Sequence, residues 1–112
     1  MVIADDDPDV ADLVAYAFAG AGHTVRAVLD GARALEVIKD LRPDIAVLDH
    51  TMPNLTGSDV VEALRAYPPT RHTIIVMITG SSPHDITAPV DRLLQKPVSP
   101  RQLTAVVAEM LA

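Results

Sequence analysis

Apolar positions follow two alternating patterns along this chain. Short apolar runs rich in β-branched residues alternate with longer stretches in which apolar residues recur at helical spacing. This alternation is typical of repeated βα units around a parallel sheet. We predict strands at residues 1–4, 24–28, 45–48, 73–78 and 92–95. The runs at 45–48 and 73–78 are apolar throughout, as expected for central strands covered on both faces. The pattern therefore predicts an α/β fold, a five-stranded parallel sheet with helices on both faces.

Four of the intervening or terminal stretches have both a start signal and an apolar stripe. The residues expected to cap or open these helices are Asp7 with Pro8, Asp30, Ser58, and Ser99 with Pro100. The stripes expected to face the core are Val10, Leu13, Val14, Ala17 and Phe18; Ala34, Leu35, Ile38 and Leu41; Val60, Val61 and Leu64; and Leu103, Val106, Val107 and Met110. The stretch from Gly80 to Pro89 has no such stripe, so the helix between the fourth and fifth strands is predicted to be short or missing.

Length and composition limit the possible classes of protein. With 112 residues the chain is one domain's worth of protein, and we treat residues 1–112 as a single domain. No apolar run approaches the ~18 residues of a membrane span, and the start lacks the pattern of a secretory signal. We therefore expect a cytoplasmic protein without membrane contact. There is no cysteine, which excludes disulfides, thiolate zinc sites and a cysteine nucleophile.

The charge pattern argues against one class of partner. The formal net charge is −6, and the nine Lys and Arg residues are scattered along the chain. A protein that binds nucleic acid directly usually carries a basic patch that contacts the phosphate backbone. We therefore expect no direct nucleic-acid binding by this chain.

Polar residues stand at the ends of four predicted strands. Asp5 and Asp6 follow the first strand, Asp49 the third, Thr79 the fourth and Lys96 the fifth. The carboxyl ends of parallel strands share one edge of the sheet, where ligands of such folds bind. Two carboxylates a few ångströms apart repel by ~4 kcal/mol at the effective dielectric of a protein surface, so three of them need a cation. Carboxylate oxygens suit Mg²⁺ (or Mn²⁺), which can also bind phosphate oxygens.

The same residues suit phosphoryl transfer. A carboxylate can act as the nucleophile and form an acyl phosphate. The Lys96 ammonium and the Thr79 hydroxyl would then offset the charge on the phosphoryl oxygens.

Four segments carry a resemblance to a known family. The stretches VIADDDPDV, IAVLDHTMPNLTG, IIVMITG and LLQKPVSP resemble the signature stretches of response-regulator receiver domains, and the resemblance covers nearly the whole chain. It implies a flavodoxin-like strand order of 2-1-3-4-5. It also implies a phospho-acceptor of two-component signalling rather than an enzyme, with self-catalysed phosphorylation and dephosphorylation at most. The implied partners are a histidine kinase or phosphotransfer protein and an output partner of unknown kind, with the chain a monomer or a weak homodimer.

The resemblance also implies a metal site. Asp49 becomes the phospho-acceptor and a metal ligand, and Asp6 a second direct ligand. Asp5 would bind the metal ion through a water molecule, and the backbone carbonyl of Thr51 would be the remaining ligand that the protein provides.

Further roles follow from the resemblance for residues around that site. Thr79 would be the switch hydroxyl, and Lys96 the ion-pair partner of the phosphoryl group, with a cis Lys96–Pro97 bond. Thr51 and Ser81 would tune the lifetime of the acyl phosphate.

Two features depart from the family pattern. Leu93 stands where receivers commonly carry the Tyr or Phe of the switch, and the stretch between Thr79 and Lys96 is shorter than usual. These departures keep a second hypothesis open, a pseudo-receiver that binds a partner without phosphorylation.

Two other interpretations are less favoured. A phosphohydrolase of the haloacid-dehalogenase type would need an Asp-x-Asp pair, whereas Asp5 and Asp6 are adjacent. His50 and His84 have no ligand-spaced partner, so neither is expected to donate a phosphoryl group or bind a metal.

Overall fold

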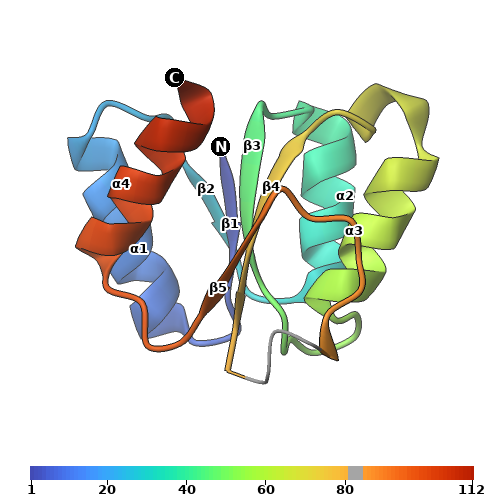
Figure 1. Cartoon of the computed structure of the whole chain (residues 1–112), viewed down its shortest axis with the longest axis horizontal. Helices are drawn as coiled ribbons and strands as arrows, with labels where there is room; N and C mark the ends of the chain where they lie inside the picture. The colour runs from blue at the N-terminus through green and yellow to red at the C-terminus, as the bar shows by residue number, and fades with distance from the viewer. Residues whose placement is uncertain (81–84) are drawn as a thin grey trace.

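The computed structural model describes residues 1–80 and 85–112 and shows a single parallel sheet. Its five strands lie in the order β2-β1-β3-β4-β5, as the resemblance implied (Figure 1). Their bounds are β1 Val2–Ala4, β2 Arg26–Val28, β3 Ile45–Asp49, β4 Ile74–Thr79 and β5 Arg92–Gln95. The α-helices in the described residues are α1 Pro8–Gly20, α2 Gly31–Leu41, α3 Gly57–Ala66 and α4 Pro100–Leu111, and a 3₁₀ turn spans Pro68–Thr70. None of these helices is long and apolar enough to span a bilayer.

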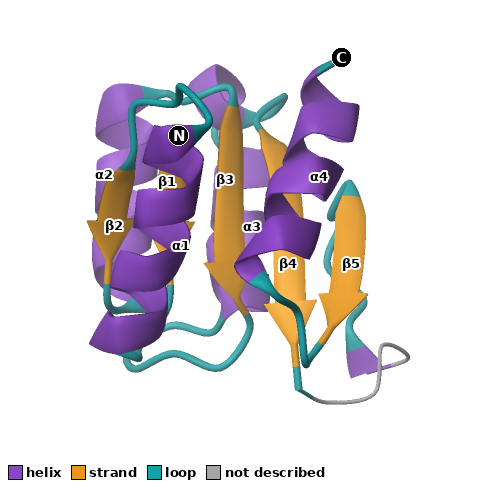
Figure 2. Cartoon of the chain, turned by 90° about the vertical axis from the view of Figure 1, so that its left-hand side faces the viewer, coloured by secondary structure: helices purple, strands orange, loops and turns teal. Residues whose placement is uncertain are grey.

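The helices form two layers around the sheet. Helices α1 and α4 cover one face, and α2 and α3 cover the other (Figures 1 and 2). Each face has its own core. The core under α1 and α4 includes Phe18, Val47, Leu103 and Val107; the core under α2 and α3 includes Ile38, Leu48, Leu64 and Met77.

Strand β3 lies at the centre because it is apolar on both faces. It pairs with β1 on one side and β4 on the other, and all five of its residues are buried. This confirms the interpretation of the continuous apolar run at 45–48. The structure extends that strand to Asp49, so the buried strand ends on a carboxylate.

The predicted helix starts are confirmed at three of four helices. The side chain of Asp7 caps α1, that of Asp30 caps α2 and that of Ser99 caps α4. The prediction for Ser58 was wrong, because Thr56 caps α3 in a reciprocal pair with Asp59. The two hydroxyl residues are close in sequence and both are good caps, so only the path of the preceding loop decides between them.

Three residues of the predicted apolar stripes are exposed rather than buried. Val10 and Leu13 of α1 and Leu41 of α2 are exposed, whereas Val14, Phe18 and Ile38 on the same helices are buried. On α1 the residues that face the sheet are Ala11, Val14 and Phe18. Val10 and Leu13 lie on the flank of this stripe, beyond the sheet's cover. Leu41 is the last residue of α2.

Strand boundaries also differ from prediction for β2 and β4. β2 starts at Arg26 rather than Thr24, because the first paired residue of its neighbour β1 is Val2, opposite Arg26. Thr24 instead accepts a hydrogen bond from the Met1 amino group. β4 runs from Ile74 to Thr79, one residue later than predicted, because its ladder with β5 includes Thr79 opposite Gln95.

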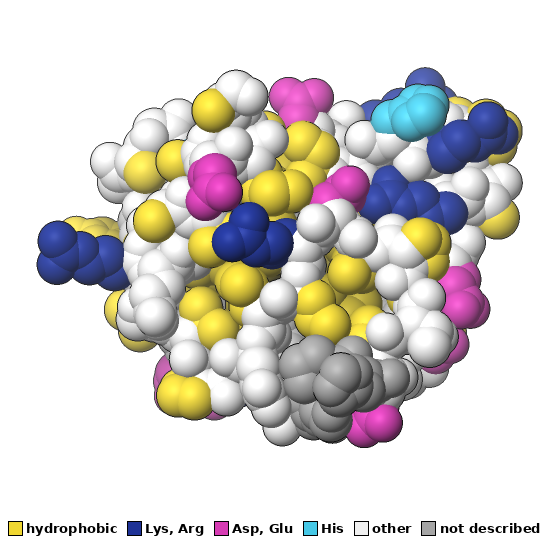
Figure 3. All heavy atoms as spheres, in the orientation of Figure 1, with side chains coloured by type: hydrophobic (Ala, Val, Ile, Leu, Met, Phe, Trp, Pro, Cys, Tyr) yellow, Lys and Arg dark blue, Asp and Glu magenta, His cyan; other side chains and the backbone are white. Residues whose placement is uncertain are grey.

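The connection between β4 and β5 lacks a covering helix in its described part. Residues 85–91 contain no α-helix, which agrees with the missing apolar stripe. Ile86, Ala88 and Val90 pack against the core under α2 and α3. On the face in Figure 3, several Lys and Arg side chains gather at the upper right beside a His, and others lie apart from them, so they do not form one continuous basic strip.

Arg65, at the end of α3, fastens this connection to the sheet. Its guanidinium donates hydrogen bonds to the carbonyl oxygens of Pro89, Arg71 and Thr73, at 3.1, 2.7 and 2.6 Å. It also forms an ion pair with Asp91 at 2.9 Å, and the same Asp91 oxygen accepts the Ile75 N–H. One side chain therefore joins α3, the turn before β4 and the residues that lead into β5.

Candidate functional site

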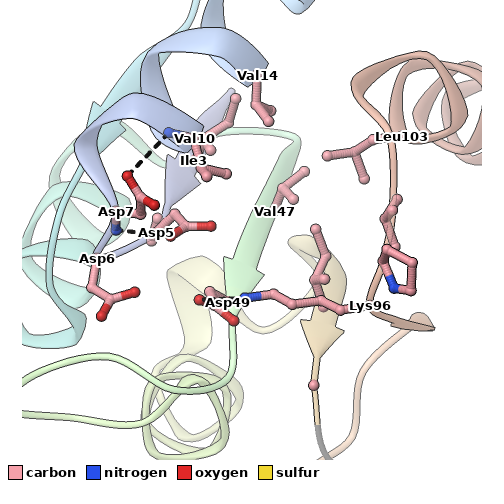
Figure 4. A pocket seen from close by; sticks show the side chains of 15 residues that line it. Ile3, Asp5, Asp6, Asp7, Val10, Val14, Val47, Asp49, Lys96 and Leu103 are labelled. Carbon is pink, nitrogen blue, oxygen red and sulfur yellow. Dashed lines mark hydrogen bonds and ion pairs between the residues drawn. The ribbon is translucent and has the colours of Figure 1, made fainter.

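The strand ends bring five predicted residues to one edge of the sheet. Asp5 and Asp6 follow β1, Asp49 ends β3, Thr79 ends β4 and Lys96 follows β5. The parallel pairing of β1, β3, β4 and β5 places these ends next to one another. A cavity of about 710 Å³ opens here, and Asp5, Asp6, Asp49 and Lys96 line it together with Val10 and Leu103 (Figure 4).

Asp49 is held firmly by its own backbone. It is only 3% exposed and pairs in register with Ile78 of β4. The sheet continues one residue further, since the His50 N–H donates to the Ile78 carbonyl oxygen at 2.9 Å. Gly57, at the start of α3, lies so close that a Cβ there would be 2.7 Å from the Asp49 carbonyl oxygen. A glycine at this position lets α3 approach the strand end, a contact that the sequence analysis did not anticipate.

The acidic pair after β1 consists of one buried and one exposed carboxylate. Asp5 is 8% exposed, and one of its oxygens accepts the Asp7 N–H at 2.9 Å. Burial raises the pKa of Asp5 above its ordinary value of 3.8; the Asp7 N–H opposes this shift, and the charge of Asp49 adds to it. Asp6 is exposed and points toward the same opening (Figure 4).

The three carboxylates form a cluster of the size that a small cation requires. Asp5, Asp6 and Asp49 each offer an oxygen, and these oxygens lie within 4.8 Å of one another. Hard oxygen donors of this kind fit Mg²⁺, which binds one or two carboxylates and keeps water or phosphate oxygens in its other positions. Burial is the main cause of the raised pKa of Asp5, and the charge of Asp49 adds a repulsion that a cation would relieve.

Lys96 supplies the positive charge of the site. Its Nζ lies 3.1 Å from an Asp49 oxygen in an ion pair whose carboxylate side chain is 4% exposed and whose lysine side chain is 44% exposed. The Lys96 N–H donates to the Thr79 carbonyl oxygen at 2.8 Å, which ties the residue to the end of β4. The Lys96–Pro97 bond is cis, as the resemblance implied. Thr79 itself is fully buried at the strand end.

The other predicted residues that the structure describes differ in how deeply they are buried. Thr51 is exposed in the loop that follows Asp49, and Met52 next to it is buried. Leu93 is half-buried and packs against the core under α2 and α3. Ser81 and His84 lie outside the described residues. His50 is half-buried, and its Nδ1 has no hydrogen-bond partner among the described residues.

Comparisons with known proteins agree on one family. A profile of the response regulator receiver domain matches residues 1–108. The DNA-binding response regulator MtrA of Mycolicibacterium smegmatis is 31% identical over 116 residues, which cover 99% of this chain and 50% of MtrA. The chain thus spans about half the length of this curated relative.

Solved structures show the same similarity. The chemotaxis response regulator CheY4 of Vibrio cholerae superposes with a TM-score of 0.88 at 26% identity, covering 96% of this chain and 94% of CheY4. A putative response regulator from Chloroflexus aurantiacus gives a TM-score of 0.88 at 31% identity, with coverage of 98% and 94%.

Proposed function

The chain belongs to the family of response regulator receiver domains of two-component signalling, and from this premise we propose that it accepts a phosphoryl group on Asp49 from a phosphohistidine. The observation that carries the proposal is the ion pair of Asp49 with Lys96 inside the carboxylate cluster. An acceptor carboxylate needs a cationic neighbour to offset the charge of the incoming phosphoryl group. Asp49 has that neighbour at 3.1 Å.

The proposed transfer is a direct displacement at phosphorus. An Asp49 oxygen forms a bond to phosphorus as the bond between phosphorus and the imidazole nitrogen of the donor breaks. The electron pair of the broken bond returns to the imidazole, and the product on this chain is an acyl phosphate. The Lys96 ammonium then pairs with a phosphoryl oxygen, and the Thr79 hydroxyl donates a hydrogen bond to another.

The carboxylate cluster would hold Mg²⁺ during this transfer. Asp6, Asp49 and the Thr51 carbonyl are its proposed direct ligands, and Asp5 its ligand through water. The bound ion would supply positive charge beside the phosphoryl oxygens. The chain's own contribution is to fix Asp49 at a buried strand end, with one carboxylate face open to the cavity (Figure 4).

The proposed partners follow from this chemistry. A histidine kinase or phosphotransfer protein would deliver the phosphoryl group, and phosphorylation would change the affinity for an output partner. The relative MtrA is named a DNA-binding response regulator. For this chain, which spans half of MtrA, we propose the phospho-acceptor role alone, in the cytoplasm and without direct nucleic-acid contact.

A second candidate function is binding of a partner without phosphorylation. Leu93 in place of the switch aromatic favours it, as does the connection fastened by Arg65. The two functions differ in whether Asp49 reacts. Only the first requires a covalent adduct.

Intact-protein mass spectrometry distinguishes them. We expect the wild type, treated with acetyl phosphate and Mg²⁺, to gain one phosphoryl group. Acetyl phosphate is an acyl phosphate and can donate its phosphoryl group to Asp49 in place of a phosphohistidine. Asp49→Asn should gain none, because an amide is not a nucleophile for this transfer. Asp44→Asn is the matched control, an exposed carboxylate before β3 at the opposite edge of the sheet, and should react as the wild type does. An adduct of similar lifetime on Asp49→Asn would show that the acceptor is another residue.

A further inference from the structure

Gly31, the first residue of α2, is in unusually close contact with the loop that follows Asp49. It is buried, and its N–H donates to the Pro53 carbonyl oxygen at 3.2 Å. A Cβ at Gly31 would overlap the Leu55 carbonyl oxygen, and it would lie 2.7 Å from the Leu55 carbonyl carbon and 2.8 Å from the Leu55 Cβ. Two of these three atoms belong to the backbone, so rotation of a side chain cannot relieve the overlap.

The requirement at this position is for space rather than for a special backbone conformation. Among the glycines only Gly22 has a positive φ. Alanine is preferred over glycine within helices in general. A glycine at the start of α2 is therefore explained by the contact with Leu55, and not by the helix.

The contacted loop carries the proposed metal ligand Thr51. It leaves β3 at Asp49 and returns to α3 at Gly57, whose N–H donates to the His50 carbonyl oxygen at 2.8 Å. Between these ends the chain turns at Asn54, which has a φ of 71°, and the Leu55 N–H donates back to the Pro53 oxygen. The first turn of α2 lies against this turn. Its position limits how far the Thr51 segment can move away from Asp6 and Asp49.

We propose that Gly31 is a positioning residue for the metal site, which holds the loop of residues 50–56 so that the Thr51 carbonyl faces the carboxylate cluster. This inference rests on the proposed function, because it needs a cation at Asp6 and Asp49. Gly31 touches neither the ion nor the phosphoryl group. It acts through the backbone of Pro53 and Leu55.

A pair of glycine variants tests the proposal. Gly31→Ala should push the loop away from α2 and weaken Mg²⁺ binding about tenfold, the lower end of what loss of support behind a metal ligand causes. Gly20→Ala is the matched control, since a Cβ at Gly20 meets nothing within 4 Å, and its Mg²⁺ affinity should equal that of the wild type. The readout is the Mg²⁺ dissociation constant of the folded protein, from amide NMR shifts of residues 6 and 49. A purely structural role would lower the melting temperature of Gly31→Ala and leave this constant unchanged, which would overturn the proposal.

A second measurement on the wild type covers the case in which Gly31→Ala does not fold. Saturating Mg²⁺ should slow hydrogen exchange at the Gly31 amide, whose acceptor is the Pro53 oxygen, at least several-fold more than at the Gly22 amide, which donates to Ala19 in a remote turn. Equal slowing at both amides would contradict the proposal. A wild type that binds no Mg²⁺ at all would instead refute the proposed function, and the role of Gly31 with it.

Discussion

The carboxyl edge of the sheet and the connection between β4 and β5 follow the family pattern to different degrees. At the carboxyl edge, Asp5, Asp6 and Asp49 form a cluster of three carboxylates, and Asp49 lies 3.1 Å from Lys96. In the connection, the switch aromatic is replaced by Leu93, and residues 85–91 contain no α-helix. The edge gathers charged side chains around one opening, whereas the connection packs apolar side chains on the core and is fixed by a single arginine.

The two regions are also held by different forces. Like charges crowd together at the carboxyl edge, and burial raises the pKa of Asp5. In the connection, Arg65 is satisfied by three carbonyl oxygens and the Asp91 carboxylate. From this difference we predict that the site keeps its chemistry while its coupling to the distant surface of α4 is weak. A ligand shifts a conformational equilibrium only by its differential affinity for the two states.

The largest expected effect on stability comes from the connection. Arg65→Met removes four hydrogen bonds and leaves Asp91 without its cation, which should destabilise the fold by about 3 kcal/mol. The Mg²⁺ affinity of the folded protein should not change, because Arg65 lies far from the cluster along α3. Arg33→Met is the control, because the exposed Arg33–Glu36 pair contributes little. Denaturant unfolding gives the stability. A Mg²⁺ affinity that falls in Arg65→Met would show that the two regions are coupled.

The next effect concerns the carboxyl edge. Mg²⁺ should stabilise the wild type by about 2.7 kcal/mol at a hundredfold excess over its Kd, since it binds only the folded cluster. Asp6→Asn should lose most of this gain and should not lower the stability of the metal-free protein, because it relieves repulsion. Thermal melts with Mg²⁺ and with a chelator measure both. A wild-type melting temperature that does not change on addition of Mg²⁺ would count against the whole metal site.

A smaller effect follows from the raised pKa of Asp5. A carboxyl group whose pKa is raised on folding binds protons more tightly in the native state, so it destabilises the metal-free fold as the pH rises through its folded pKa. Asp5→Asn keeps an oxygen for the Asp7 N–H and removes the charge. The variant should therefore be more stable than the wild type at pH 7, and the difference should shrink as the pH falls toward 4. Thermal melts in a chelator at both pH values measure the difference in stability between the variant and the wild type. A difference that grows as the pH falls would contradict the prediction.

Much of the fold could be predicted from the sequence, because it depends on patterns that packing enforces locally. The apolar runs predicted all five strands, and the cap residues predicted three of four helix starts. The third helix start was missed, because Thr56 and Ser58 are chemically alike and only the loop path selects Thr56. The exposure of Val10 and Leu13 was missed as well. The helical stripe on α1 is wider than the surface that the sheet and α4 cover.

The candidate site was likewise predictable in part. The proximity of Asp5, Asp6, Asp49, Thr79 and Lys96 follows from the rule that parallel strands end at one edge. The contacts of Gly31 with Leu55 and of Gly57 with Asp49 have no such signal, since they join backbones from separate elements without any polar side chain. The hydrogen bonds by which Arg65 holds the connection could not be predicted either. Their acceptors are mainly backbone carbonyl oxygens, which every residue has, so the sequence does not identify them.

Amide NMR with beryllofluoride and Mg²⁺ tests both halves of the comparison at once, since beryllofluoride mimics the phosphoryl group on an acceptor carboxylate. With an intact site and weak coupling, the amides near Asp6, Asp49, Thr79 and Lys96 should shift strongly, and those of Leu103 to Met110 in α4 only weakly. An absence of shifts at the carboxyl edge would contradict the phospho-acceptor function and favour the pseudo-receiver. Large shifts throughout α4 would show that Leu93 and the fastened connection transmit the signal as an aromatic switch does.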